Sequence, residues 1–373
     1  MNPEAWMGEA LLLAQKGRGF VEPNPRVGAL ALRGDTVVGK GFHRSYGGPH
    51  AEVEAVRDAE ARGHRPDGVV VTLEPCSAHG KKTPPCTEFL LGRGIRRVIV
   101  GARDPDPRHA GRGLVQLREA GVAVVEGIFA REVLAENRAF LRSLTLDRPW
   151  TAAKWAMSLD GKAATHTGNA RWISSPGART LVHQLRAAVD AVVVGMGTVL
   201  ADDPELTVRR VRGDNPLRIV VDPEAALPDG SQLLRTARET PLLVLVSAHA
   251  GAAATERLLR HGAKVLAVRD AAPGPSGRRR LDLADAWREL RRGGLRRVLV
   301  EGGGRLLADL VAARCLDQTY VFVAPKLVGG ATAPTPLAGA GVARMDQALV
   351  LTETFHQAVD GDLLVGGFVV EDP

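Results

Sequence analysis

Cysteine is scarce in this sequence, with three in 373 residues. So small and odd a number excludes a disulfide framework and is typical of a reducing compartment, where a close cysteine pair more often binds metal or takes part in catalysis. The sequence also lacks a run of ~20 apolar residues that could span a membrane, and its N-terminus lacks the basic-then-apolar pattern of a secretion signal. We therefore expect a cytoplasmic protein with no membrane partner.

Aromatic residues are also few, at 4% of the chain, although the net charge is +7 and the pI is near 9.7. Such a basic balance favours anionic partners, either nucleic acid or phosphorylated small molecules. Basic runs such as "SGRRRLDL" are short and lack the interleaved aromatics of a groove for single-stranded nucleic acid. We therefore expect a phosphorylated small molecule and no nucleic acid. The alternative is that the arginines are simply spread over solvated faces.

The length of the chain exceeds that of one typical core, so two domains are expected. An apolar content of 45% with 24% charged residues is ordinary for a globular protein. Strand and helix patterns alternate in both halves, which predicts an α/β fold in which sheets are covered by helices. "LTLDRPW" (144–150) is the expected joint, and the predicted domains are 1–147 and 148–373.

The predicted elements of the first half include a hairpin over 27–43 that turns at Gly34-Asp35. Helices are predicted at 4–16, 50–62, 113–120 and 129–142 and after Pro84-Pro85, with strands at 68–75, 96–103 and 122–127.

In the second half, strands are predicted at 191–195, 217–222, 241–247, 264–268, 297–303 and 319–329. Helices are predicted at 175–188, 253–261, 282–293 and 304–315. A terminal hairpin is predicted around 349–355 and 363–370. Cys315 falls in the last of these helical patterns and is interpreted as a small buried hydrophobe.

The other two cysteines, Cys76 and Cys86, lie in "LEPCSAHGKKTPPC", downstream of "GGPHAEVEAV", where His50 and Glu52 begin a predicted helix. This order matches the zinc deaminase pattern of His-x-Glu, Pro-Cys and a later Cys. Three protein ligands leave the fourth position of zinc open for water, whose pKa the metal lowers toward ~7. Glu52 would then carry the proton to the departing amine. The alternative, a core histidine with two inert cysteines, explains each residue singly but not all four in order.

Other histidines could compete for the metal. His79 lies between the two cysteines, but His50 is the better ligand because Glu52 then follows it on the same helix turn. We expect His79 to contact substrate or solvent. His43, His64 and His109 are expected to be ordinary surface residues.

Two Gly-containing motifs stand out in the second half. "VVVGMGTVLADDPELTVR" (192–209) runs from a strand into a small-residue turn and an acidic pair. "VLVEGGGRLLADLV" (298–311) runs from a strand through a Gly-rich turn into a helix, whose N-terminus could bind a phosphate. It is not the dinucleotide-binding G-x-G-x-x-G motif, and a purely structural turn is the alternative.

Taken together, these segments resemble one family. "EPNPRVGA", "PHAEVEA" and "TLEPCSAHGKKTPPC" resemble the deaminase domain of the bifunctional riboflavin-biosynthesis deaminase/reductases. "AMSLDGKAA", "RWIS", "GMGTVLADDPELTVR", "EGGGRLL" and "APKLVGG" resemble the reductase domain of the same family. The resemblance implies a cytidine-deaminase-like α/β/α domain followed by a dihydrofolate-reductase-like α/β domain that uses NADPH.

The resemblance also implies an activity and partners. The first domain would hydrolytically deaminate 2,5-diamino-6-(5-phospho-ribosylamino)pyrimidin-4-one with Zn²⁺, and the second would reduce the ribosyl group to ribityl with NADPH. A homo-oligomer is expected. One alternative function is a nucleic-acid base deaminase with an appended binding domain. The other is a first domain without catalytic activity, in a single-function reductase with a structural zinc.

By the same resemblance, specific residues acquire roles. The implied cofactor contacts are Ala156, Trp172, Thr198, Asp202, Gly303, Gly304, Arg305, Leu306 and Leu307. The implied substrate contacts are Asn24, Ala170, Arg186, Leu206, Arg209 and Glu301. Arg186 and Arg209 could hold the substrate phosphate, for which the guanidinium group is suited. The alternatives are a loop-capping role for Asn24, a helix N-capping role for Asp202 or Asp203, and surface ion pairs for the arginines.

Three departures from the family pattern are visible. Nine residues lie between Cys76 and Cys86, one more than is usual in the family. Ala170 replaces a frequent serine, which removes a hydroxyl contact, and Pro223 replaces another frequent serine near the cofactor. Lys154 and Lys162, on either side of the "SLDG" turn, are less specific candidates for substrate or cofactor contacts.

Overall fold

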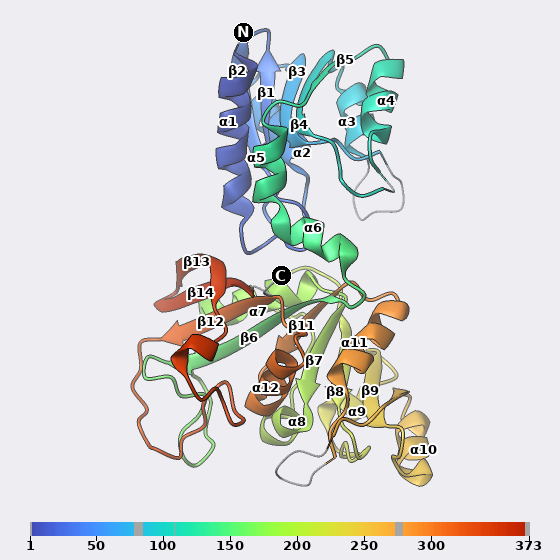
Figure 1. Ribbon diagram of the computed structural model, residues 1–373, viewed down its shortest axis with the longest axis vertical. Coiled ribbons are helices and arrows are strands. Elements are labelled where there is room, and N and C mark those ends of the chain that lie inside the picture. The colour runs from blue at the N-terminus through green and yellow to red at the C-terminus, as the bar shows by residue number, and fades with distance from the viewer. Residues whose placement is uncertain (1, 78–84, 108, 273–278, 370–373) are drawn as a thin grey trace. The chain divides into compact units, whose positions relative to one another are not determined.

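The computed structural model describes residues 2–77, 85–107, 109–272 and 279–369. The chain divides into two compact units, Met1–Thr145 and Leu146–Pro373 (Figure 1). Each unit has its own sheet and its own apolar core, and each is described separately below.

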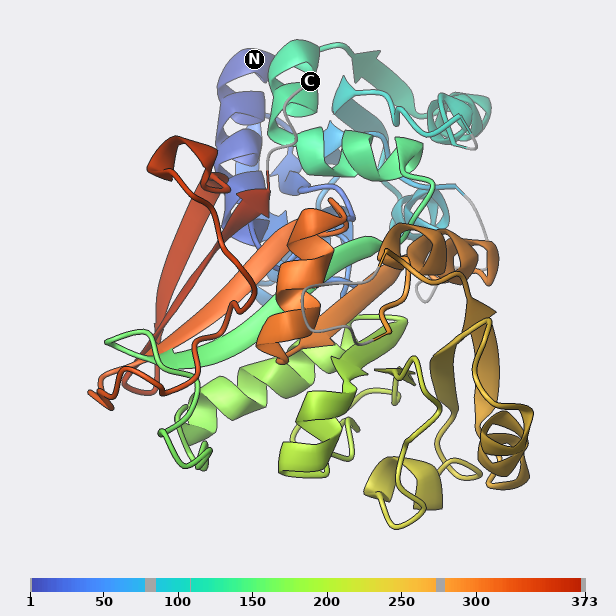
Figure 2. The same ribbon diagram turned by 60° about the horizontal axis from the view of Figure 1, so that its bottom comes forward.

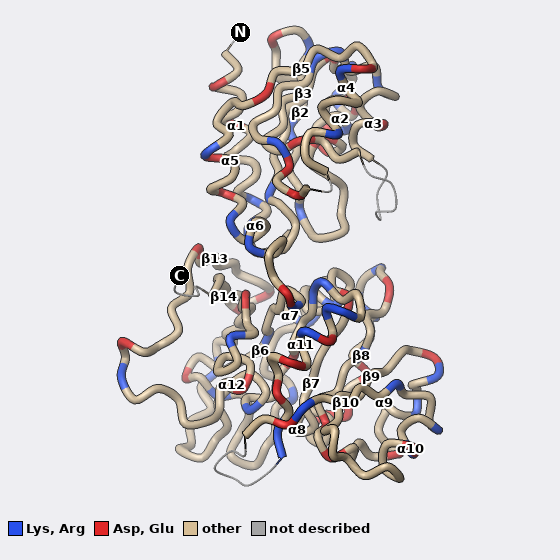
Figure 3. Tube along the Cα trace, turned by 45° about the vertical axis from the view of Figure 1, so that its right-hand side comes forward, with Lys and Arg blue, Asp and Glu red and all other residues tan. Residues whose placement is uncertain are grey.

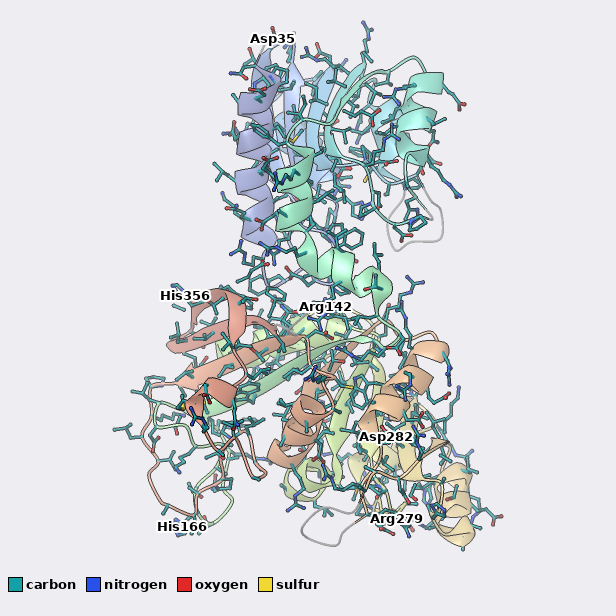
Figure 4. All side chains as sticks on the ribbon, in the orientation of Figure 1. Asp35, Arg142, His166, Arg279, Asp282 and His356 are labelled. Carbon is teal, nitrogen blue, oxygen red and sulfur yellow. The ribbon has the colours of Figure 1, made fainter. Side chains whose placement is uncertain are left out.

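The first unit is built on a five-stranded sheet with the order β2-β1-β3-β4-β5. Its strands are β1 (Gly28–Arg33), β2 (Thr36–Phe42), β3 (Gly68–Leu73), β4 (Arg97–Ala102) and β5 (Ala123–Glu126). The hairpin β1–β2 turns at Gly34 and Asp35 as predicted, and Figure 4 labels Asp35 at its tip. Strand β1 pairs antiparallel with β2 and β3, whereas β3, β4 and β5 are parallel. The carboxyl end of β3 therefore leads directly to Cys76.

Helices cover both faces of this sheet. The helices of this unit are α1 (Pro3–Ala14), α2 (Ala51–Ala61), α3 (Cys86–Gly92), α4 (Arg112–Glu119), α5 (Ala130–Glu136) and α6 (Arg138–Thr145), with a 3-10 turn at Gln15–Gly17. Alternate residues of β3 and β4 pack against α1 on one face and against α2, α3 and α4 on the other. Burial of these alternating Val, Leu and Ile side chains is the main force that holds the layers together.

The second unit is built on a nine-stranded sheet with the order β10-β9-β8-β7-β11-β6-β12-β14-β13. Its strands are β6 (Trp150–Ser158), β7 (Ala191–Gly195), β8 (Leu217–Val221), β9 (Leu242–Ser247), β10 (Lys264–Val268), β11 (Arg297–Glu301), β12 (Gln318–Ala324), β13 (Leu351–Val359) and β14 (Asp362–Val369). From β10 to β12 the strands are parallel, and β14 and β13 then add an antiparallel edge.

The helices of the second unit are α7 (Pro176–Ala187), α8 (Met196–Asp202), α9 (Gln232–Arg235), α10 (Ala252–Arg260), α11 (Leu283–Arg292) and α12 (Gly304–Ala312), with a 3-10 turn at Met345–Gln347. Helices α11 and α12 contribute Trp287, Leu290 and Leu307 to one core beside the sheet. Figures 1 and 2 show α7 on the opposite face.

Most predicted elements are present, and the errors occur at their ends. The helix predicted over 129–142 is two helices, because Asn137 ends α5 and α6 begins at Arg138. The strand predicted to reach residue 329 ends at Ala324, and the helix predicted to reach Cys315 ends at Ala312. The expected turn after β7 is instead the short helix α8. Cys315 is buried, as predicted.

The composition also led to predictions about the distribution of charge and about membrane-spanning segments. In both units basic and acidic residues are interspersed along the trace (Figure 3). Within the described residues, none of the helices combines the length and apolar character needed to cross a bilayer.

Candidate active sites

His50 is positioned by the close packing of helix α2 on strand β2. Gly39 and Gly41 face this helix, and a Cβ atom on either residue would overlap its backbone at Ala55. Only glycine permits so close an approach. His50 is the N-cap residue of α2, and Glu52 lies in the first turn, where it is 3% exposed. The two side chains therefore leave the same helix end, as the sequence predicted.

Cys76 lies just after the end of a strand, and Cys86 lies at the start of a helix. Cys76 follows β3, and the preceding Glu74 accepts hydrogen bonds from the backbone N–H groups of Asp104, Gly111 and Gly113, which fixes this segment. Cys86 is the first residue of α3, and its N–H lies 3.4 Å from the sulfur of Cys76. A free N–H at a helix start stabilises a thiolate.

His50, Cys76 and Cys86 converge, with their ligand atoms all within 4.8 Å of one another. The Nδ1 atom of His50 is 3.0 Å from the Cys86 sulfur and 3.5 Å from the Cys76 sulfur. Tetrahedral zinc with ordinary bond lengths would place a nitrogen and a sulfur about 3.5 Å apart. The donor types and spacing therefore fit zinc. Elsewhere in the described part of the chain, no other three His, Cys, Asp or Glu residues gather in this way.

The two thiols of this cluster are shifted in opposite directions, because the hydrogen bond with the Cys76 side chain and burial raise the pKa of Cys86. The hydrogen bond with the Cys86 side chain, together with the neighbouring His50, lowers the pKa of the Cys76 thiol. Burial raises the pKa of Glu52, and the nearby His50 opposes that rise. A thiolate beside a buried carboxyl group that is ready to hold a proton is the combination that metal-assisted hydrolysis requires.

One prediction about the residues around this cluster is wrong. His43, predicted to be an ordinary surface residue, is 4% exposed, and its ring lies edge-on to that of His50 with centroids 5.5 Å apart. Burial lowers the pKa of His43 to about 4. The alternation of β2 could have indicated its position, because Gly39, Gly41 and His43 follow the same face. His79 lies outside the described residues.

Asn24 lies on the turn between Glu22 and Val27. Its side chain is half-buried, and its N–H donates to the carbonyl oxygen of Val21 over 2.9 Å. The turn is connected to the metal-ligand cluster through Val27, whose carbonyl oxygen accepts the N–H of His43.

In the second unit, the polar candidate residues gather where β6, β7 and β11 end. These parallel neighbours place their carboxyl ends at one edge of the sheet, the usual location of ligands in such folds. Glu301 forms a two-pronged ion pair with Arg186, with N–O distances of 2.5 and 2.9 Å. Arg186 also donates to the carbonyl oxygen of Thr207 over 3.0 Å. Its guanidinium group is thus held in one orientation.

Lys154 belongs to the same cluster. Burial lowers the pKa of its ammonium group, and the carboxylates of Glu301 and Asp202 act against that decrease. Asp202 ends helix α8, and its carbonyl oxygen accepts a hydrogen bond from Arg171. The adjacent Asp203 accepts the N–H of Gln232 over 2.7 Å and so tethers α8 to α9.

Arg209 lies on the loop that follows Leu206, which is itself buried. Its side chain is about half exposed and pairs with Glu205 at 2.5 Å, while its N–H donates to Nδ1 of the buried His183 over 3.0 Å. Arg209 is thus the more accessible of the two predicted phosphate-binding arginines. Sequence reasoning did not identify His183, since a lone histidine in a helical pattern carries little signal.

The predicted cofactor contacts differ in their surroundings. Gly303 has φ 83° and is the N-cap of α12, and a Cβ atom there would lie 3.3 Å from the Thr198 hydroxyl. The turn at Gly303 and helix α8, which carries Thr198, are therefore neighbours. Gly304 and the exposed Arg305 follow Gly303 in the chain. By contrast, Leu306 and Leu307 are core residues, so only their backbone groups could contact a cofactor.

The remaining predicted contacts lie around the segment that joins β6 to α7. Ala156 and Ala170 are half-buried, and Trp172 is 63% exposed. The guanidinium carbon of Arg179 lies 4.5 Å from the centroid of the Trp172 ring, and Lys326 donates to the Trp172 carbonyl oxygen over 2.6 Å. So exposed an aromatic ring offers a stacking surface.

Comparison with known proteins yields two family matches. Residues 149–365 match the RibD C-terminal domain, and residues 1–102 match the cytidine and deoxycytidylate deaminase zinc-binding region. The chain is 37% identical over 365 residues to the riboflavin biosynthesis protein RibD of Actinobacillus pleuropneumoniae, covering 98% of this chain and 95% of that protein. It is 38% identical over 327 residues to its Aquifex aeolicus counterpart, covering 87% of each.

Solved structures give the same result. RibD of Acinetobacter baumannii (form 1) matches with a TM-score of 0.66 and 30% identity over 99% of each chain. A diaminohydroxyphosphoribosylaminopyrimidine deaminase/5-amino-6-(5-phosphoribosylamino)uracil reductase from Thermotoga maritima matches with a TM-score of 0.65 and 32% identity, also over 99% of each chain.

Proposed function

Because this chain belongs to the family of bifunctional riboflavin-biosynthesis deaminase/reductases, we propose which of its residues carry out the two reactions. The chain is a zinc-dependent deaminase of 2,5-diamino-6-(5-phospho-ribosylamino)pyrimidin-4-one and an NADPH-dependent reductase of the ribosyl group of the product. We assign deamination to residues 1–147 and reduction to residues 148–373.

In the first domain, His50, Cys76 and Cys86 are the proposed zinc ligands. When bound, zinc supplies the acidity that makes water a nucleophile at neutral pH. Glu52 takes a proton from this water and delivers it to the departing amine, a transfer that its burial and raised pKa favour. Asn24 is the proposed hydrogen-bonding partner of the pyrimidine.

A single observation carries this assignment. The imidazole of His50 and the sulfurs of Cys76 and Cys86 lie close together beside the buried carboxyl group of Glu52. They come from the starts of two helices and the end of one strand. Such a donor set with a neighbouring proton carrier matches the catalytic zinc sites of hydrolytic deaminases.

In the second domain, NADPH supplies the hydride, and the protein supplies binding and orientation. Thr198, Asp202 and the turn that contains Gly303 are the proposed cofactor cradle, with Arg305 beside it and Trp172 as a stacking surface. Ala156, Gly304 and the backbone of Leu306 and Leu307 complete the proposed set.

The substrate of the second domain would lie next to Glu301, with Arg209 holding its phosphate. Arg186 is so fully bonded to Glu301 and Thr207 that its contribution is to orient Glu301 and to add positive charge. Leu206 and Ala170 provide apolar contacts.

A time course on the diaminopyrimidine phosphate tests both assignments. Mass spectrometry should show an amino group replaced by oxygen, followed by the gain of two hydrogen atoms. Omission of NADPH should stop the reaction at the deaminated compound. Reduction without prior deamination, or no deaminated product when NADPH is omitted, would contradict the proposed sequence of steps.

The proposed partners are small molecules and further copies of the chain in the cytoplasm. Strong thermal stabilisation by NADPH with no retention of RNA would support this over the alternative, a nucleic-acid base deaminase. Sedimentation would report whether the chain forms a homo-oligomer.

A further inference from the structure

The C-terminal end of helix α5 lies against the turn that carries Asn24. The acidic side chain at this helix end needs an explanation. Glu136 is the last residue of α5, and no basic residue lies in that last turn. An acidic side chain at a helix C-terminus is disfavoured by the helix dipole. A compensating interaction should therefore exist.

The compensation comes from two arginines of the first unit. Arg26 donates to Glu136 over 2.8 Å, and Arg18 donates to the same oxygen over 3.2 Å. Arg26 is 2% exposed and also donates to Glu22 over 2.6 Å. Glu22 and Arg26 lie on either side of Asn24, so one guanidinium group spans the turn and connects it to α5.

Asn137 holds the same turn by its backbone. Its Oδ1 atom accepts the N–H of Arg26 over 2.7 Å, and its Nδ2 atom donates to the carbonyl oxygen of Arg26 over 3.2 Å and to that of Val133 over 2.9 Å. Asn137 is 3% exposed. A buried amide that satisfies both backbone groups of one residue fixes the position of that residue, since losing either bond leaves a buried polar group unpaired.

We propose that Glu136 and Asn137 are positioning residues of the deaminase, because they fix the turn that presents Asn24. They lie beyond residues 1–102, the part that matches the deaminase zinc-binding region. The turn is also joined to the zinc ligands, because His43 donates its N–H to Val27 and packs against His50. The inference rests on the proposed role of Asn24 in holding the pyrimidine.

The test compares Glu136→Ala and Asn137→Ala with Glu132→Ala, a matched control on the exposed side of α5. In the full-length zinc-loaded protein, both variants should raise the KM of deamination about tenfold while kcat changes less than about threefold. Zinc content and NADPH-dependent reduction should stay close to those of Glu132→Ala. The melting temperature of the first unit should fall in both variants, because each leaves a buried group of Arg26 without its partner, so the kinetics are measured below that temperature.

The same substitutions in an Asn24→Ala background distinguish positioning from a merely structural role. If they act through Asn24, they should change KM by less than about twofold there. Full additivity, an unchanged KM in either zinc-loaded single variant, or loss of zinc in both would overturn the inference. An unchanged KM in Asn24→Ala alone would contradict the proposed role of Asn24 itself, and the inference with it.

Discussion

The two candidate sites are built in different ways. In the first unit, His50, Cys76 and Cys86 come from three separate segments of the chain but place their ligand atoms within 4.8 Å of one another. In the second unit, the candidate residues extend along the ends of several strands, and much of the expected cofactor cradle is backbone. A metal site depends on a few side chains, whereas a dinucleotide site depends on a surface. The first should therefore be sensitive to single substitutions and the second more tolerant.

Replacement of a proposed zinc ligand is the strongest test of this contrast. Cys76→Ser should release zinc and reduce deamination to background, because an alcohol does not ionise to form a good ligand. Reduction of the separately supplied deaminated compound should remain within about twofold of wild type. Zinc analysis and the two assays would measure this. If both activities vanish while the protein stays folded, the sites are not independent and the domain boundary near 147 is misplaced.

The proton carrier should be nearly as sensitive. Glu52→Gln keeps the shape of the side chain but cannot exchange a proton, so kcat of deamination should fall by about 10²–10⁴ while zinc is retained. Steady-state kinetics with metal analysis of the same sample is the measurement. Deamination at the wild-type rate would remove Glu52 from the mechanism.

In the second unit, the most sensitive residue should be Glu301. Glu301→Gln leaves Arg186 and Lys154 without their buried carboxylate, and loss of one partner of a buried ion pair lowers the free energy of unfolding by about 3–5 kcal/mol. Glu205→Gln, which breaks the more exposed pair with Arg209, should lower it by less than about 1 kcal/mol. Urea unfolding of the second unit would compare the two. If both substitutions lower the free energy of unfolding equally, the ion pair of Glu301 with Arg186 contributes no more to stability than an exposed pair.

A smaller effect than that of Glu301 is a pH dependence centred on His183. Burial, followed by the charges of Arg186 and Arg209, lowers the pKa of His183 to about 4. The unfolded chain, with a pKa near ~6.5, binds more protons between these values. The associated stability is therefore present above pH ~6.5 and is lost as the pH falls toward 4.

His183→Asn isolates this contribution, because the Asn oxygen can still accept the N–H of Arg209 but does not titrate. From pH 6.5 to pH 4.5 the wild type should lose about 2 kcal/mol more stability than the variant, at ~1.4 kcal/mol per pKa unit. Parallel pH profiles of the two proteins would contradict the burial of a neutral His183.

These contrasts explain what could be predicted from the sequence. The order of the elements and the grouping of the metal ligands could be predicted, because strand alternation and a His-x-Glu, Cys, Cys series are local patterns. The break between α5 and α6 could not, since it depends on Asn137 bonding to Arg26, more than one hundred positions away. The burial of His43, by contrast, could have been inferred, because His43 continues the face of β2 that carries Gly39 and Gly41.

The second site was harder to predict for the same physical reason. That Leu306 and Leu307 belong to the core follows from how α12 packs on the sheet. The pairing of Arg186 with Glu301 joins α7 to β11 across 115 positions, and no sequence pattern reports such a distant ion pair. Residues there could be assigned only by resemblance.

Removal and return of zinc would test the central claim most directly. Metal analysis of the purified protein should find one zinc ion per chain. A chelator should abolish deamination, leave NADPH-dependent reduction of the deaminated compound intact, and be reversed by added zinc. Full deaminase activity in protein shown to contain no metal would contradict the account.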